Sequence, residues 1–118
     1  MAMIKNDADV GSIKGKLAAA LDDSPGLLVA AGATLLYGMN IANGVAAMTY
    51  IQCFNAAALV DVTLGTTTPD LAIPVITSGT LELSLTKPIL FPKGLVVFST
   101  NSATGATGAA TNGTIYYA

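Results

Sequence analysis

The charged residues of this chain are distributed unevenly, and this constrains its fold more than any other feature. Seven of the twelve charged side chains lie within residues 1–23, and residues 24–60 carry none. Because soluble surfaces normally carry charge, a neutral stretch of this length belongs in a core, a membrane or an assembly. The sequence therefore predicts a charged N-terminal arm, residues 1–25, and a nearly neutral body, residues 26–118.

The uncharged stretch is a poor match to a membrane-spanning helix. Its longest nearly apolar run, Gly26–Met39, is shorter than the roughly 20 residues that a helix needs to cross a bilayer. Asn40, Asn43 and Gln52 then interrupt the apolar character. We therefore expect strands of a protein core here, and no contact with a membrane.

Short apolar segments separated by turn residues predict that the body is all-β. Leu81, Leu83 and Leu85 alternate with polar residues, which is the period of a strand buried on one face. Pro74 should confine its strand to a sheet edge or a bulge, because proline has no N–H to donate. About seven or eight such strands predict an antiparallel β-sandwich or a jelly-roll-like barrel.

One hairpin is expected near the middle of the chain. Asn43 and the glycine after it tolerate positive φ and predict a tight turn. The alternation in residues 33–41 places Tyr37 and Met39 on the same face of a strand. Residues 47–55 form the next alternating run, and we expect the two runs to pair with each other.

Within the arm, residues Ser12–Leu21 have the pattern of a short helix. Ser12 is an acceptable N-cap, and Ile13, Leu17 and Leu21 share one helical face. The alternative is an extended arm that docks onto a neighbouring subunit or another protein. In either form we expect the arm to bind a partner. The residues predicted to do so are Lys5, Asp7, Asp9, Ile13, Lys14, Lys16 and Leu17.

The composition argues against catalysis and against nucleic-acid binding. The chain has no histidine, which removes the commonest general base and metal ligand, and all five cations are lysines that form no basic stripe. Cys53 lies in an apolar strand and is expected to be a buried, inert thiol. Asp61 and Asp70 could flank a Ca²⁺ ion, but no acidic cluster accompanies them. We therefore expect no enzyme, catalytic residue, cofactor or metal site, and no nucleic-acid partner.

The neutral body predicts self-association. Fourteen threonines, all after residue 23, supply β-branching and hydroxyl groups where other proteins use charge. Strand edges without charge invite pairing with other chains. We therefore expect a permanent homo-oligomer whose apolar interface exceeds about 2,000 Å².

Four segments, taken in order, resemble small structural proteins of tailed phages. They are residues 36–41 (LYGMNI), 46–55 (AAMTYIQCFN), 64–69 (LGTTTP) and 91–95 (FPKGL). The resemblance covers about residues 35–99. Asn55 stands where that family often has aspartate, and the strand over residues 94–99 lacks a second glycine after it.

This resemblance implies a β-sandwich component of a virion. Among such roles we favour a capsid decoration, or cement, protein that binds the outer capsid and stabilises it as a homotrimer. Its partners would be other copies of itself and the major capsid protein, and its location the virion, assembled in the host cytoplasm. The alternatives are a tail, fibre or baseplate component, and a non-viral lectin-like binding module. For the last, Trp is absent and only Tyr116 and Tyr117 are expected to be free.

Overall fold

The computed structural model describes residues 13–118, which form eight β-strands and one 3₁₀ turn. The predicted all-β class is confirmed. The strands are β1 (Lys14–Leu21), β2 (Leu27–Ala31), β3 (Thr34–Ala42), β4 (Thr49–Asn55), β5 (Leu71–Val75), β6 (Thr80–Phe91), β7 (Gly94–Thr100) and β8 (Thr111–Tyr117), and the 3₁₀ turn η1 spans Leu59–Asp61.

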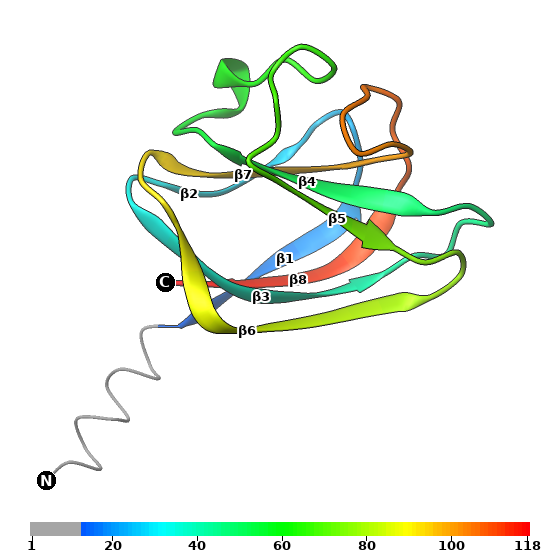
Figure 1. Cartoon of the computed structure of the whole chain (residues 1–118), viewed down its shortest axis with the longest axis horizontal. Coiled ribbons are helices and arrows are strands. Elements are labelled where there is room, and N and C mark those ends of the chain that lie inside the picture. Colours follow the sequence, from blue (N-terminus) through cyan, green and yellow to red (C-terminus); the bar gives the residue numbers. More distant parts are fainter. Residues whose placement is uncertain (1–12) are drawn as a thin grey trace, which may run out of the picture.

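Two four-stranded antiparallel sheets pack face to face (Figure 1). One has the order β1-β8-β3-β6 and the other β2-β7-β4-β5. The pairs β1:β8, β2:β7, β3:β6 and β4:β5 are nested, so the chain resembles one long hairpin that has been rolled up. This is the strand order of a jelly roll, and it confirms the fold that the sequence predicted.

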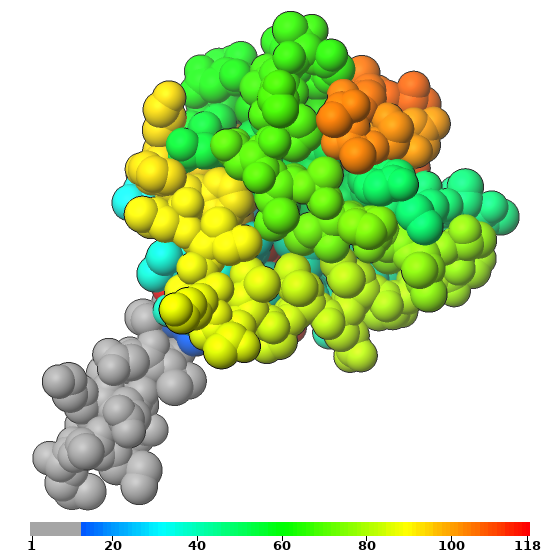
Figure 2. Space-filling view, in the orientation of Figure 1, coloured from blue at the N-terminus to red at the C-terminus, as the bar shows by residue number. Residues whose placement is uncertain are grey.

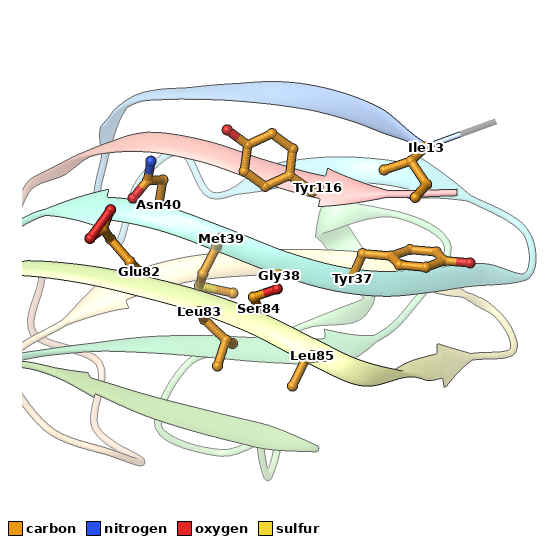
Figure 3. Close-up of a pocket in the computed structure, with 10 residues that line it drawn as sticks. All are labelled: Ile13, Tyr37, Gly38, Met39, Asn40, Glu82, Leu83, Ser84, Leu85 and Tyr116. Carbon is orange, nitrogen blue, oxygen red and sulfur yellow. The ribbon is translucent and has the colours of Figure 1, made fainter. Parts of the chain in front are cut away.

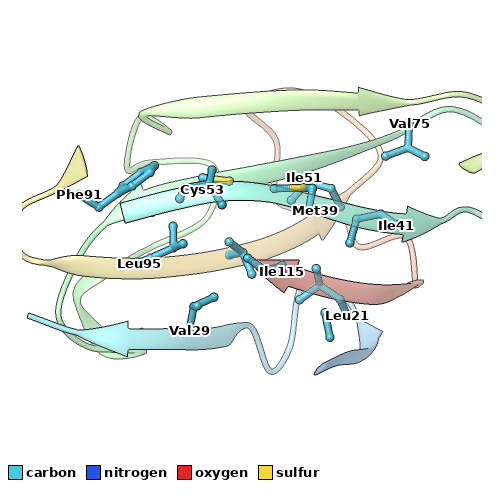
Figure 4. Close-up of a cluster of buried hydrophobic side chains, with 13 residues drawn as sticks. Leu21, Val29, Met39, Ile41, Ile51, Cys53, Val75, Phe91, Leu95 and Ile115 are labelled. Atoms are coloured by element: carbon cyan, nitrogen blue, oxygen red, sulfur yellow. The ribbon is translucent and has the colours of Figure 1, made fainter. Parts of the chain in front are cut away.

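The core lies between the two sheets (Figure 4). Met39, Ile41 and Ile115 point into it from the first sheet, and Ile51 and Cys53 from the second, each at most 1% exposed. Burial of such side chains contributes roughly 1.5–3 kcal/mol each. The contact between the sheets is therefore the main source of stability.

The second sheet is also covered on its outer face. Phe54 and Phe98 pack edge to face there, with ring centroids 5.8 Å apart, beneath Leu59 and Leu64 of the long β4–β5 connection. Gln52, on the same face, donates hydrogen bonds to the carbonyls of the loop over residues 101–110. These two segments lie above the sandwich in Figures 1 and 2, in green and orange. We call β2-β7-β4-β5 the covered sheet and β1-β8-β3-β6 the exposed sheet.

The hairpin expected around Asn43 is wrong. β3 and β4 belong to different sheets, and residues 43–48 carry the chain from one sheet to the other. The Asn43 side chain, 2% exposed, holds this crossing by donating to the carbonyl oxygens of Ala47 at 2.9 Å and Ile76 at 3.0 Å. The asparagine therefore fixes a corner between the sheets instead of a tight turn.

The helix expected over Ser12–Leu21 is also wrong. Residues 14–21 are strand β1, which pairs with β8 in the register Lys16 to Ile115 and Leu17 to Thr114. This part of the proposed arm thus belongs to the exposed sheet. Residues 14–21 form a strand instead of a helix because an isolated helix of this length is marginal in water, whereas the free edge of β8 offers a row of hydrogen-bonding groups.

A bulge in β3 reverses the predicted position of one aromatic residue. Leu36 is buried and pairs with Tyr117, and Gly38 pairs with Tyr116, so Tyr37 is the extra residue between them. Met39 points into the core as expected, but Tyr37 does not share its face. A bulge of one residue inverts the alternation on one side of it.

Two other strand predictions are confirmed. In β6, Leu81, Leu83 and Leu85 pack against the core, while Glu82 is exposed. β5, which contains Pro74, is an edge strand of the covered sheet. Among residues 13–118 we find no helix with the length and apolar character needed to cross a membrane.

Candidate functional site

The predicted partner-binding residues that the structure describes, Ile13, Lys14, Lys16 and Leu17, do not all lie on one face of the sheet. Lys5, Asp7 and Asp9 lie outside the described residues. Leu17 is 69% exposed and, with its cross-strand partner Thr114, faces away from the core. Lys16 lies opposite the buried Ile115 and thus on the other face of the strand. Lys14 is on the same side as Lys16, and Ile13 precedes the strand with 36% exposure.

A groove of about 340 Å³ opens on the exposed sheet (Figure 3). The polar side chains in it, Asn40, Glu82 and Ser84, are exposed, and Tyr116 is 39% exposed. Figure 3 shows Asn40 and Glu82 toward one end and Tyr37 toward the other, whereas Leu83 and Leu85 point toward the second sheet. The groove therefore combines aromatic rings with hydrogen-bonding groups.

The groove exists because of how β3 is paired. Between the pairs Leu36 to Ile89 and Gly38 to Ser84, β3 has only Tyr37 while β6 has residues 85–88. The extra residues of β6 interrupt the pairing of the two strands beside the groove. At Gly38 itself the strands lie close together, because a Cβ at this position would overlap the carbonyl oxygen of Leu83.

A second surface is the end of the sandwich where the β3–β4 and β5–β6 connections lie side by side. Its exposed apolar residues are Val45 (37%), Met48 (42%) and Ile76 (62%), with the exposed Ala46 and Ala47 between the first two. We call these five residues the apolar tip; it lies at the right-hand end of the molecule in Figures 1 and 2.

Hydrogen bonds join the two connections that make the apolar tip. The N–H of Ser78 donates to the carbonyl of Val45 at 3.1 Å, and that of Asn43 donates to the carbonyl of Gly79 at 2.8 Å. The Asn43 side chain adds its bonds to Ala47 and Ile76. The tip is therefore a preorganised surface, which lowers the entropy lost when a partner binds.

The carboxylates that the sequence raised as Ca²⁺ candidates lie apart from Glu82. Asp61 and Asp70 line a pocket of about 260 Å³ beside the β4–β5 connection, together with Lys93. The Asp70 carboxylate accepts a hydrogen bond from the N–H of Asn55 at 2.7 Å. Among residues 13–118 no group of three or more His, Cys, Asp or Glu side chains is placed to hold a metal.

Cys53 is fully buried in the core, as expected. Desolvation, and secondarily the nearby charge of Asp70, raises the pKa of its thiol to about 12. At neutral pH the group is therefore protonated. A protonated thiol is a poor nucleophile and a poor metal ligand.

Comparison of the chain with protein-family models, with curated proteins and with solved structures finds no match.

The sequence predicted neither surface as a whole. Of the two tyrosines expected to be free, Tyr116 is 39% exposed in the groove, whereas Tyr117 is half-buried and packs against the core. Strict alternation predicted that Tyr37 lies in the core; the glycine directly after it was the available sign of a bulge. The tip residues Val45–Met48 form an apolar run next to a turn signal, and such a run in a connection is exposed unless another segment covers it. Pairing of the two connections through space had no local signal.

Proposed function

We propose that this chain is a structural protein of a tailed-phage virion, a decoration protein that binds the outer capsid as a homo-oligomer. The observation that carries the proposal is the apolar tip, a preorganised hydrophobic surface on a jelly roll that has almost no charge to keep copies apart. The four ordered segments that resemble small phage structural proteins supply the virion context.

A second copy of the chain is the partner that best fits the apolar tip. Residues 43–48 and 71–80 contain no charged side chain, so the tip offers nothing to pair with a charged surface. Residues 24–118, with five charges in all, provide a partner of the same neutral character. Contacts around a symmetry axis would bury every tip at once, and we propose a trimer.

The same properties support the proposed capsid role. A protein that stabilises a lattice acts through many weak contacts made together, and an oligomer multiplies each contact through effective concentration. We propose that the charged residues Lys5, Asp7 and Asp9 contact the major capsid protein. Deletion of residues 1–12 tests this contact, because it leaves β1 in the sheet, whereas a deletion to residue 24 would remove that strand.

Mass measurement by light scattering at low micromolar concentration tests the oligomer. We expect a mass three times that of the 11.8 kDa chain. Met48→Lys and Ile76→Lys should each give a folded monomer, since the new charge would have to be desolvated in the interface. Val60→Lys is the matched control, because Val60 is 89% exposed but lies on the β4–β5 connection. A wild-type monomer would refute the oligomer.

Binding to purified capsids that lack the protein tests the location. Saturable, stoichiometric binding is expected, together with a rise in the temperature at which the capsid breaks down. Binding to tails or baseplates in place of capsids would contradict the decoration role and favour the tail-component alternative.

A further inference from the structure

We infer that the groove on the exposed sheet is a binding site for a neutral saccharide. The site would be formed by Tyr37 and Gly38 of β3, Tyr116 of β8, and Asn40, Glu82 and Ser84 of β3 and β6 (Figure 3). It is separate from the apolar tip, so it does not depend on the virion role.

Two aromatic residues, Tyr37 and Tyr116, line the groove. Gly38 lies opposite Tyr116 on β8 and opposite Ser84 on β6. Gly38 has no side chain that could pack against its cross-strand partner Tyr116, which is 39% exposed, so a ligand can pack against the Tyr116 ring. Aromatic faces carry partial negative charge and attract the C–H groups on the apolar face of a sugar ring.

Hydrogen-bonding groups occupy the next row of the sheet. Asn40 and Glu82 are cross-strand partners, and both are exposed. An amide supplies donors and acceptors, and an ionised carboxylate supplies acceptors only. Adjacent hydroxyls of a sugar are donors and acceptors at once, so a neighbouring amide and carboxylate can engage a pair of them.

The charge of the groove favours a neutral ligand. Among the described residues, 13–118, Glu82 is the one carboxylic acid that lines the groove, and no cation lines it. An anionic ligand such as a phosphate or a sulfated sugar would meet repulsion there. One carboxylate is also too few for a metal site. A neutral polyhydroxylated ligand fits both conditions.

The size of the groove suits this class of ligand. At about 340 Å³ it is at the lower end of the range of small-molecule sites, roughly 300–1,000 Å³. It is a shallow hollow on a sheet face, so it would hold one or two sugar units of a longer chain and leave the rest in solvent. Affinity on the order of 1 mM is expected from so few contacts.

Amide NMR of the ¹⁵N-labelled full chain tests the inference. The neutral probes are maltohexaose, cellohexaose, hexa-N-acetylchitohexaose and mannohexaose, and the charged probes are a heparin hexasaccharide and pentalysine. At least one neutral probe should give saturable shifts centred on Gly38, Asn40, Glu82 and Tyr116. The inference is overturned if no neutral probe binds at roughly 10 mM, if only a charged probe binds, or if the shifts lie elsewhere.

Variants separate the saccharide site from general surface effects. Tyr116→Ala should weaken binding about tenfold, and Tyr116→Phe, which keeps the ring, much less. Leu90→Ala is the control, since Leu90 is 56% exposed on the same sheet but does not line the groove. Unchanged affinity in Tyr116→Ala would refute the site. So would groove shifts that depend on protein concentration without ligand, because a second copy would then be the occupant.

Discussion

The two sheets differ in what happens on their outer faces. On the covered sheet, Phe54 and Phe98 form a second apolar cluster beneath the β4–β5 connection. On the exposed sheet, the equivalent face presents Asn40, Glu82 and Tyr116 to solvent. The strands explain the difference, because all of β7 is buried while β6 alternates between exposed and half-buried residues over most of its length. A strand that is apolar on both faces needs a cover on each.

The largest expected effect is on stability when the cover of the covered sheet is weakened. Phe54→Ala should lower the free energy of unfolding by about 3–5 kcal/mol, because it leaves a cavity under the β4–β5 connection. Tyr116→Ala, an aromatic truncation on the exposed sheet, should cost no more than about 1 kcal/mol. Urea unfolding at one fixed protein concentration measures both. Equal losses would show that the two outer faces are energetically alike.

The close approach of β3 and β6 in the exposed sheet can be tested by substituting Gly38. Gly38→Ala should cost up to about 3 kcal/mol, because its Cβ would overlap the carbonyl oxygen of Leu83 and force β3 and β6 apart. Gly44→Ala is the matched control, since nothing lies within 4 Å of the position that a Cβ would take there. Thermal unfolding of the two variants is the measurement. A Gly38→Ala protein as stable as Gly44→Ala would mean that the strands separate freely at the bulge.

The smallest expected effect compares one amide on each sheet. Gln52 is fully buried, and its Nε2 donates to Thr100 Oγ1 at 2.8 Å and to the carbonyls of Ser102 and Gly105. Gln52→Ala should cost about 1 kcal/mol globally and speed amide exchange in the loop over residues 101–110. Asn40→Ala, on the exposed sheet, should change neither quantity. Unaltered exchange in the Gln52 variant would mean that other contacts hold the loop.

Much of the fold could be predicted because its signals are local. The alternation of Leu81, Leu83 and Leu85 placed one face of β6 against the core, and Pro74 placed β5 at an edge. The candidate site could not be predicted in the same way. Tyr37 lies in the groove because of a bulge in β3. Ile76 lies in the apolar tip because hydrogen bonds join two connections that are about thirty residues apart in the sequence.

The wrong predictions of the hairpin and of the helix have one cause. Asn43 was a valid sign of a change in chain direction, and residues 14–21 were a valid amphipathic segment. Neither pattern contains information about which strand lies next in space. β1 pairs with β8, with Lys14 opposite Tyr117, and β3 pairs with β6 and β8. Such pairings depend on long-range contacts, which a local pattern cannot specify.

The amino-acid sequence alone determined that this chain is all-β, that its body is nearly free of charge and that its strands have two unlike faces. Those properties follow from side-chain period and composition, which act within a few residues. Only the tertiary structure decided how the strands pair in a nested order and which of the two sheets is covered by connecting segments. It also decided where exposed apolar and aromatic residues come together. These depend on segments that meet through space, where a single inserted residue is enough to turn a side chain from the core to the surface.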